Sequence, residues 1–135
     1  MIIAMRKANE DSFAAIVDVL KSGGIVVLRT DTIYGIVTCA DNRKNSDTIF
    51  AMKQRDADKS CIVLIASDEQ MWDDVSRDAY QAAKRVLSDA YPTSVIVPIG
   101  DRTPSWLVHH DQHQDDIAFR IPVTTPWLVE VLKQT

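Results

Sequence analysis

Hydroxyl groups and a carboxylate follow a short apolar run near the start of the chain. The run Ile25–Leu28 is mostly β-branched and comes after a glycine pair, which predicts a buried strand. The polar side chains at its end are Thr30, Asp31, Thr32 and Tyr34. Open α/β sheets bind ligands at strand ends, so we interpret these residues as the lining of a cavity for a small polar molecule. A Thr/Asp turn between two strands is the alternative.

Three cations lie close together further along the chain. Lys53, Arg55 and Lys59 fall between a predicted helix and a predicted strand. Arginine offers a planar fork that suits phosphate or carboxylate, and lysine adds a mobile point charge. The cluster therefore predicts an anion site. The alternative is a solvated loop that Asp56 and Asp58 partly neutralise.

Arg120 interrupts an otherwise apolar run, residues 117–121. A guanidinium in such a strand must be paired or must face a cavity, because a buried unpaired charge is costly. A ligand carboxylate would suit it, and so would an ion pair with Asp31 or Asp116.

The histidines and cysteines do not indicate a metal centre or a covalent mechanism. His109, His110 and His113 lie in a polar loop without a cysteine nearby and without the spacing of a helical zinc pair, so we expect no metal there and expect them to be dispensable. Cys39 and Cys61 each have apolar neighbours, which favours reduced core thiols. No Ser-His-Asp or Cys-His set is apparent from local context.

Predicted helices and strands alternate along the chain. Apolar spacing predicts a helix over 13–20 that ends at Gly23, and Ser46 or Asp47 is expected to cap a second helix with Ile49, Phe50 and Met52 or Lys53 on its inner side. The run 61–66 is apolar on both faces, which predicts a central strand. The remaining predicted elements are strands at 36–40, 95–99 and 117–121 and helices after Ser67, Ser76 and Thr125. The pattern indicates an α/β (α+β) fold, a mixed sheet flanked by helices.

The composition is that of one globular domain, expected to span residues 1–135. Hydrophobic residues make up 46%, and the formal net charge of −4 argues against a general nucleic-acid binder. We expect no membrane association and a cytoplasmic location, because the sequence shows no apolar run of spanning length and no signal-peptide pattern. Neither the Gly-x-Gly-x-x-Gly loop nor the phosphate-binding P-loop is present.

Four motifs in register resemble the YrdC-like family, the threonylcarbamoyl-AMP synthases of tRNA modification, in its short bacterial form. They are Gly24–Gly35 with Thr-Asp-Thr-x-Tyr-Gly, then Lys53-Gln54-Arg55 with Lys59, the strand 62–66, and Phe119-Arg120-Ile121-Pro122. The resemblance implies a twisted mixed sheet around a concave, cationic cavity. It also implies a nucleotidyltransferase that makes threonylcarbamoyl-AMP and pyrophosphate from L-threonine, bicarbonate and ATP with Mg²⁺.

The resemblance also implies partners and residue roles. Thr32 would contact threonine and Arg120 its carboxylate, while Lys53, Arg55 and Lys59 would bind the phosphates or carbamate, with Lys53 and Arg55 serving catalysis. Other proteins would transfer the product to adenosine 37 of tRNA, and double-stranded RNA or tRNA is a further expected partner. An alternative of another class is a non-catalytic module that binds RNA, a nucleotide or a partner protein in the same cavity.

The sequence departs from the family pattern at three places. Arg29 stands where proline is usual, and Pro92-Thr93-Ser94-Val95-Ile96 replaces a Pro-Gly-Pro-x-Thr motif. The family's Ser-Ala-Asn-x-Ser-Gly loop, which contacts ATP, is not found in the 135 residues. If these 135 residues are the whole protein, we expect threonine binding to be retained better than ATP binding.

Overall fold

The structure of the protein is a computed structural model, and it describes residues 12–54, 61–87 and 90–135, with only the backbone of 72–74. The helices of this part are α1 (Phe13–Lys21), α2 (Arg43–Met52), α3 (Arg77–Leu87) and α4 (Pro126–Gln134), with 3₁₀ helices η2 (Asp68–Asp74) and η3 (Ser105–Leu107). The strands are β1 (Val26–Arg29), β2 (Tyr34–Val37), β3 (Ile62–Leu64), β4 (Ser94–Pro98) and β5 (Asp116–Arg120). The mixture confirms the predicted α+β class.

The strands form two sheets, where the sequence had suggested one. β1 and β2 make an antiparallel hairpin, and the second sheet has the order β3-β5-β4, with β3 parallel and β4 antiparallel to β5. The prediction of a central strand at 61–66 is wrong within the described residues, because β3 pairs there with β5 alone and Ile62 is 47% exposed. An apolar run predicts burial, but it does not say how many strands flank it.

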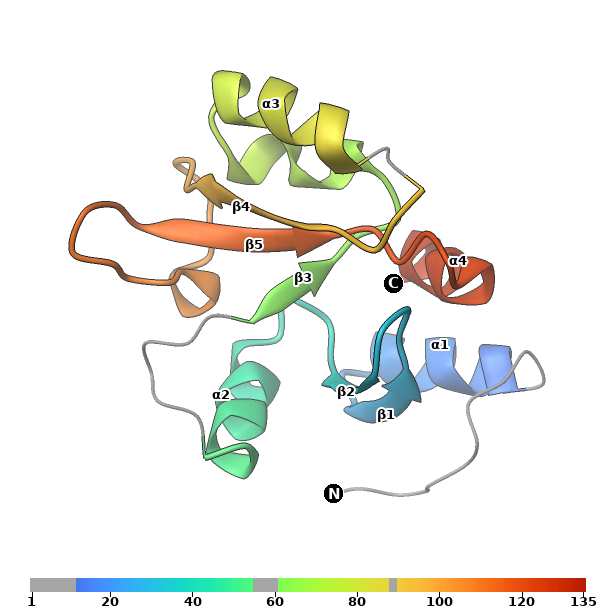
Figure 1. The fold of residues 1–135 in the computed structure, drawn as a ribbon. Helices are drawn as coiled ribbons and strands as arrows, with labels where there is room; N and C mark the ends of the chain where they lie inside the picture. The colour runs from blue at the N-terminus through green and yellow to red at the C-terminus, as the bar shows by residue number, and fades with distance from the viewer. Residues whose placement is uncertain (1–11, 55–60, 88–89) are drawn as a thin grey trace.

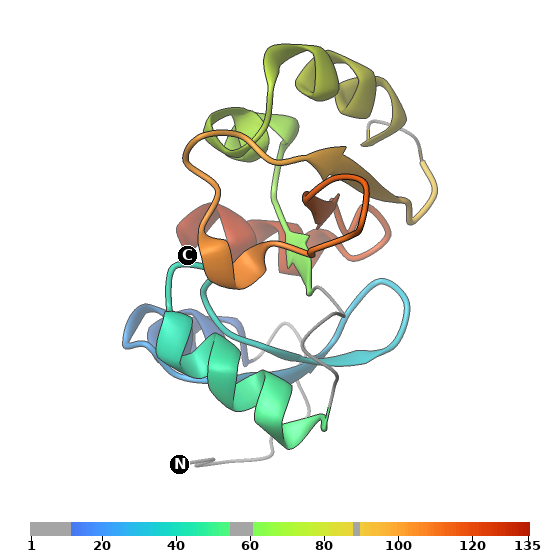
Figure 2. The same ribbon diagram turned by 90° about the vertical axis from the view of Figure 1, so that its left-hand side faces the viewer.

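Each sheet packs on helices of its own (Figures 1 and 2). α3 covers one face of the three-stranded sheet, and Phe119, Met71 and Tyr80 belong to the core between them. α1 and α4 pack together beside the hairpin, where Leu28, Leu128 and Val131 are buried. Leu64 of β3 also packs against this second cluster, so the two cores meet at the β3 edge.

The α1–β1 connection follows the predicted helix end. Gly23 has φ of +77°, a left-handed conformation that glycine adopts without strain, and its N–H bonds to the carbonyl of Leu20. Gly24 follows with its N–H on the carbonyl of Val19, and a Cβ at this position would lie 2.5 Å from the Val19 side chain. Helix α1 therefore turns directly into β1, which fixes where the strand delivers its polar end.

Helix α2 begins earlier than predicted. The side chain of Asn42, rather than Ser46 or Asp47, caps it by accepting a hydrogen bond from the N–H of Asn45. Ser46 is buried inside the helix, where its hydroxyl bonds to the carbonyl of Asn42. Ile49 is buried as expected, whereas Met52 and Lys53 are exposed, so the predicted inner side was wrong at the end of the helix. Three possible cap residues close together made the start ambiguous from sequence.

Candidate functional site

Arg120 lies where the hairpin tip meets the three-stranded sheet. The register pairs Arg120 of β5 with Ser94 of β4, so both side chains point to the same face. Nε of Arg120 donates a hydrogen bond to Oγ of Ser94 at 2.9 Å, and Nη1 donates to Oγ1 of Thr32 at 3.1 Å. The guanidinium therefore joins β4, β5 and the loop between β1 and β2, although Thr32 is 88 positions away in sequence.

Asp31 supplies the charge that faces Arg120. Its Oδ1 lies 3.6 Å from Nη1 of Arg120, and its side chain has no exposed surface. Neither carboxylate oxygen has a hydrogen-bond partner in the described part of the chain. Of the two structural partners that the sequence suggested for Arg120, the structure thus gives Asp31, while Asp116 lies at the other end of β5 and pairs with His109. Burial of this carboxylate is offset mainly by the nearby guanidinium.

Thr30 shapes the turn that presents Asp31 and Thr32. Its hydroxyl donates to the carbonyl of Ile33 at 2.6 Å and accepts hydrogen bonds from the N–H groups of Thr32 and Ile33. The two threonine hydroxyls are 3.4 Å apart. Thr30 thus makes the Thr/Asp turn that the sequence offered as an alternative, and the same turn positions Thr32 on Arg120. Tyr34 begins β2 and is 65% exposed.

The predicted phosphate site is described only in part. Lys53 directly follows α2 and is exposed, and its side chain makes no hydrogen bond or ion pair with Arg120 or the turn within the described residues. Arg55 and Lys59 lie outside the described residues. The phosphate-binding role of these three cations stays a prediction, and Arg120 is the cation that the structure shows among the hydroxyl groups.

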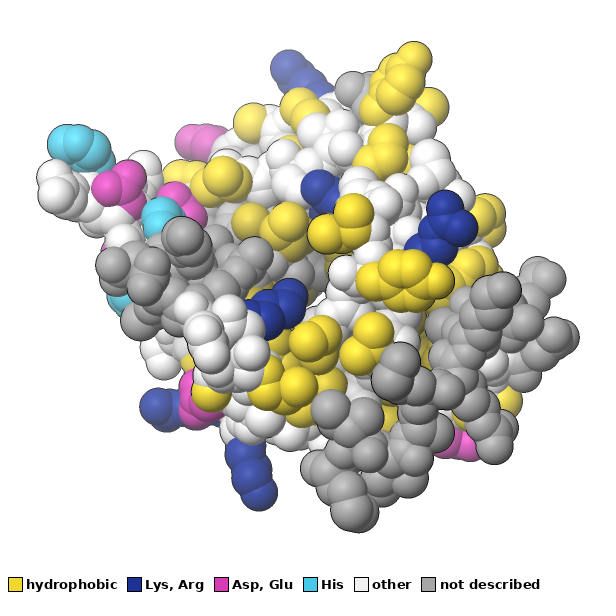
Figure 3. Space-filling view, turned by 60° about the horizontal axis from the view of Figure 1, so that its bottom comes forward, with side chains coloured by type: hydrophobic (Ala, Val, Ile, Leu, Met, Phe, Trp, Pro, Cys, Tyr) yellow, Lys and Arg dark blue, Asp and Glu magenta, His cyan; other side chains and the backbone are white. Residues whose placement is uncertain are grey.

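Apolar side chains border Arg120 on the same face of its sheet. Ile62 and Ile96 both pair with Ala118, one pleat before Arg120, and they are 47% and 69% exposed. Ile33 at the hairpin tip is 74% exposed. Figure 3 shows Lys and Arg side chains set among hydrophobic ones on one face of the molecule. A ligand at Arg120 would therefore meet one fixed cation, several hydroxyls and an apolar border.

Sequence reasoning missed Ser94 as a site residue. Its position in a degraded motif gave no reason to single it out, and its relevance depends on the antiparallel register that places it opposite Arg120. Only a predicted pairing of β4 with β5 could have shown that this serine lies opposite Arg120.

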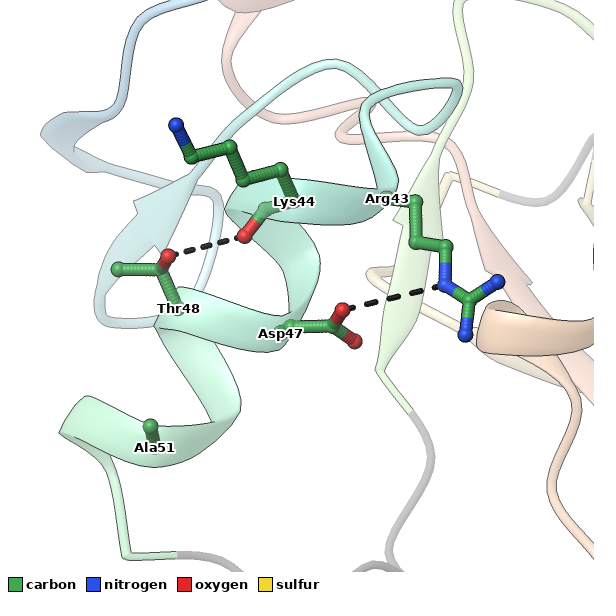
Figure 4. A pocket seen from close by; sticks show the side chains of 5 residues that line it. All are labelled: Arg43, Lys44, Asp47, Thr48 and Ala51. Atoms are coloured by element: carbon green, nitrogen blue, oxygen red, sulfur yellow. Dashed lines mark hydrogen bonds and ion pairs between the residues drawn. The ribbon is translucent and has the colours of Figure 1, made fainter.

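Two shallow pockets lie away from Arg120. One of about 610 Å³ runs along the outer side of α2 and is lined by Arg43, Lys44, Asp47, Thr48 and Ala51 (Figure 4). Figure 4 shows Asp47 directed toward Arg43, with which it pairs at 3.9 Å. The other, of about 480 Å³, lies between the end of α1 and the end of α4. Neither is lined by residues of the Arg120 cluster, and neither contains a buried charge.

The histidines of the polar loop form side-chain pairs with aspartates. Nδ1 of His109 lies 3.2 Å from Asp116, and Nδ1 of His110 lies 3.0 Å from Asp115. The described residues contain no group of three or more His, Cys, Asp or Glu side chains that could hold a metal ion. Burial, and then the charge of Asp41, raises the pKa of the Cys39 thiol, which disfavours the reactive thiolate. None of the helices in the described ranges is long and apolar enough to cross a lipid bilayer.

Together, the fold and the Arg120 cluster define an α+β domain with a guanidinium held by hydrogen bonds at the junction of two sheets. The family model of the Sua5/YciO/YrdC proteins, which carries the description "Telomere recombination", matches residues 18–135. The chain belongs to the Sua5/YciO/YrdC family.

Known relatives agree with this assignment, and a solved structure shares the fold. The chain is 31% identical over 105 residues to threonylcarbamoyl-AMP synthase of Xanthomonas axonopodis pv. citri, covering 76% of this chain and 54% of the relative. It is 25% identical over 117 residues to the enzyme of that name from Pseudoalteromonas translucida, covering 84% and 61%. The structure of P. abyssi Sua5 complexed with L-threonine superimposes with a TM-score of 0.73 at 23% identity, over 96% of this chain and 37% of that one. The chain thus spans less than two thirds of each of these proteins.

Proposed function

We propose that this chain provides the threonine-binding part of an L-threonylcarbamoyl-AMP synthase. The observation that carries the proposal is Arg120, which is fixed by hydrogen bonds to Ser94 and Thr32 at the edge of an apolar-bordered face. A guanidinium beside threonine hydroxyls suits an amino acid that brings a carboxylate and a hydroxyl. A protein of the same fold has been solved with L-threonine, which supports this choice of ligand.

The proposed reaction needs no protein nucleophile. The threonine amine adds to the carbon of bicarbonate with loss of water, which gives a carbamate. A carbamate oxygen then attacks the α-phosphate of ATP, the bond to the β-phosphate breaks, and pyrophosphate leaves. Within this scheme Arg120 and Thr32 would hold the threonine while its amine stays available to react. Positioning of the two reactants and cationic stabilisation of phosphate charge would supply the rate enhancement.

The proposed phosphate contacts are Lys53, Arg55 and Lys59. Mg²⁺ would accompany ATP and would be held through its phosphates. The described residues contain no group of three His, Cys, Asp or Glu side chains that would form a dedicated protein site for Mg²⁺, and the Asp31 carboxylate already faces Arg120. Transfer of the product to tRNA by other proteins, contact with tRNA or double-stranded RNA, and a cytoplasmic location belong to the same proposal.

Calorimetric titration of the chain with L-threonine tests the first part of the proposal. L-Valine is the matched control ligand, since it has the shape of threonine without the hydroxyl. We expect L-threonine to bind more tightly than L-valine, and we expect Thr32→Val to remove most of that difference. Equal affinities for the two amino acids, or no detectable binding of either, would overturn the threonine assignment.

A second candidate function is a module that binds its ligand without turnover. The observation that favours it is the placement of Lys53, which is exposed and makes no bond with the Arg120 cluster within the described residues. Among the described residues of the cluster, Arg120 is then the cation that could bind a substrate with several phosphate charges, and it is already paired with Asp31. Release of pyrophosphate from ATP that depends on both threonine and bicarbonate separates the two candidates. Only a synthase would produce it.

A further inference from the structure

Ser94 binds Arg120 at Nε, the guanidinium nitrogen that is attached to Cδ of the side chain. Its Oγ accepts the hydrogen bond of Nε at 2.9 Å, across the directly paired position of β4 and β5. Nε has a single hydrogen, so this bond uses all of its donor capacity. Both residues belong to paired strands rather than to a loop, which makes the arrangement well defined.

The rest of the guanidinium is divided between the protein and the open face. Nη1 donates to Thr32 at 3.1 Å and lies 3.6 Å from the buried carboxylate of Asp31. No partner of Nη2 is found within the described part of the chain, and the Arg120 side chain keeps 16% of its surface exposed. The two N–H groups of Nη2 and the second N–H of Nη1 are therefore the donors that remain for a ligand.

We propose that Ser94 is a positioning residue, which orients Arg120 so that an anionic ligand is received at the end of the guanidinium that carries Nη1 and Nη2. An arginine can bind a carboxylate side-on, through Nε and Nη2, or end-on, through Nη1 and Nη2. The bond to Ser94 excludes the side-on mode, because it occupies Nε. The ligand's carboxylate must then approach the Nη1 and Nη2 atoms, away from the bond between Nε and Ser94. The identity of that carboxylate as threonine's rests on the proposed function, whereas the orientation of Arg120 does not.

Preorganisation gives Ser94 an effect on affinity without contact to the ligand. Without the bond at Nε, the arginine would sample other rotamers and would pay an entropic cost to return to the binding orientation. The loss of one such bond predicts a weakening of L-threonine binding by about 3- to 10-fold. Thr32 and Asp31 would still hold Nη1, so binding should be reduced rather than abolished.

The matched pair Ser94→Thr and Ser94→Val tests this inference. Threonine and valine have the same shape and both suit a β-strand, but only threonine keeps the hydroxyl. The first measurement needs no ligand: the ¹H–¹⁵N signal of Arg120 Nε, assigned with Arg120→Lys, should be protected from solvent exchange in the wild type and in Ser94→Thr. It should lose that protection in Ser94→Val. Ser105→Ala, an exposed serine of η3, should leave the signal unchanged.

The second measurement is the dissociation constant for L-threonine. We expect Ser94→Thr to stay close to the wild type and Ser94→Val to bind about 3- to 10-fold more weakly. An Nε signal that is equally protected in both variants would overturn the proposal. Equal threonine affinity of both variants would overturn the positioning role even if the hydrogen bond is present. If the wild type shows the protected signal but binds no threonine, the orientation stands and the proposed function fails.

Discussion

The two sheets contribute to the site in different ways. The three-stranded sheet supplies Arg120 and Ser94 from paired strands, with Phe119 buried next to them against the α3 side. The hairpin supplies Asp31 and Thr32 from a turn that Thr30 holds together by local hydrogen bonds. The cation is therefore positioned by a sheet core, and the hydroxyls and carboxylate by a short loop.

This difference explains how two separate cores can build one site. The guanidinium reaches out of the three-stranded sheet and bonds to the hairpin turn, while Leu64 at the sheet edge packs into the hairpin core. One link is polar and the other is apolar. If both links are strong, the two regions unfold as one unit, and a substitution in either core should lower the free energy of unfolding of the whole molecule.

The largest expected effect comes from a cavity in either core. Phe119 and Leu28 are 1% and 0% exposed and belong to different cores. Phe119→Ala should lower the free energy of unfolding by about 3–5 kcal/mol, and Leu28→Ala by about 2–5 kcal/mol. Urea denaturation followed by circular dichroism should show one transition in each variant.

Exposed apolar residues of the same sheets provide the controls. Ile96→Ala and Val27→Ala, at 69% and 45% exposure, should change stability much less than the core variants do. Two separate transitions in Leu28→Ala, with the second close to that of the wild type, would show that the hairpin region unfolds on its own. The two regions would then be independent folding units.

The next effect concerns the polar link between the regions. Arg120→Ala should cost about 3 kcal/mol, because it leaves the buried carboxylate of Asp31 without its countercharge. Asp31→Asn removes that charge, so the double variant should be less destabilised than the sum of the single variants. Chemical denaturation of the four proteins gives the coupling energy. Strictly additive effects would mean that the 3.6 Å contact between Arg120 and Asp31 contributes nothing to joining the two regions.

Local features of the fold could be predicted from the sequence, and pairings could not. Apolar spacing predicted α1, and Gly23 predicted its end, because both depend on neighbours within one turn. The strand around Arg120 was also predicted, together with its need for a partner, since a charge among apolar residues is informative by itself. The edge position of β3 was not predictable, because it depends on which strands lie beside it.

For the site, too, local features could be predicted from the sequence and strand pairings could not. Thr32, Asp31 and Arg120 were candidates from residue type, and the structure brings them together. Ser94 was missed because an ordinary serine acquires its role only through the register of β4 with β5. Asn42 was missed as a cap because other capping residues follow it closely, and only backbone geometry decides among them.

The smallest effect tests the three-stranded region alone, through the side chains that join η2 to α3. The hydroxyl of Tyr80 donates to Asp68 at 2.7 Å, and Lys84 lies 3.1 Å from the same carboxylate oxygen. The Tyr80 hydrogen bond, together with Lys84, lowers the pKa of Asp68, and the bond to Asp68 raises the pKa of Tyr80. Asp68→Asn should therefore cost about 1 kcal/mol near neutral pH.

The pH dependence of this contribution follows from the lowered pKa of Asp68. An acid whose pKa is lower in the folded state stabilises the fold above its ordinary value of 3.8, and the contribution is lost as the pH falls through the folded value. The difference in unfolding free energy between the wild type and Asp68→Asn should thus be constant from about pH 5 to about pH 8, and it should shrink below about pH 4. Glu69→Gln, an exposed neighbour in η2, is the control and should show no comparable loss.

A spectrophotometric tyrosine titration adds a second readout, because Asp68→Asn should bring the raised pKa of Tyr80 back toward its ordinary value of 10.0. If the stability difference persists undiminished at pH 2 to 3, well below the ordinary Asp range, the contribution comes from packing and not from the charge of Asp68.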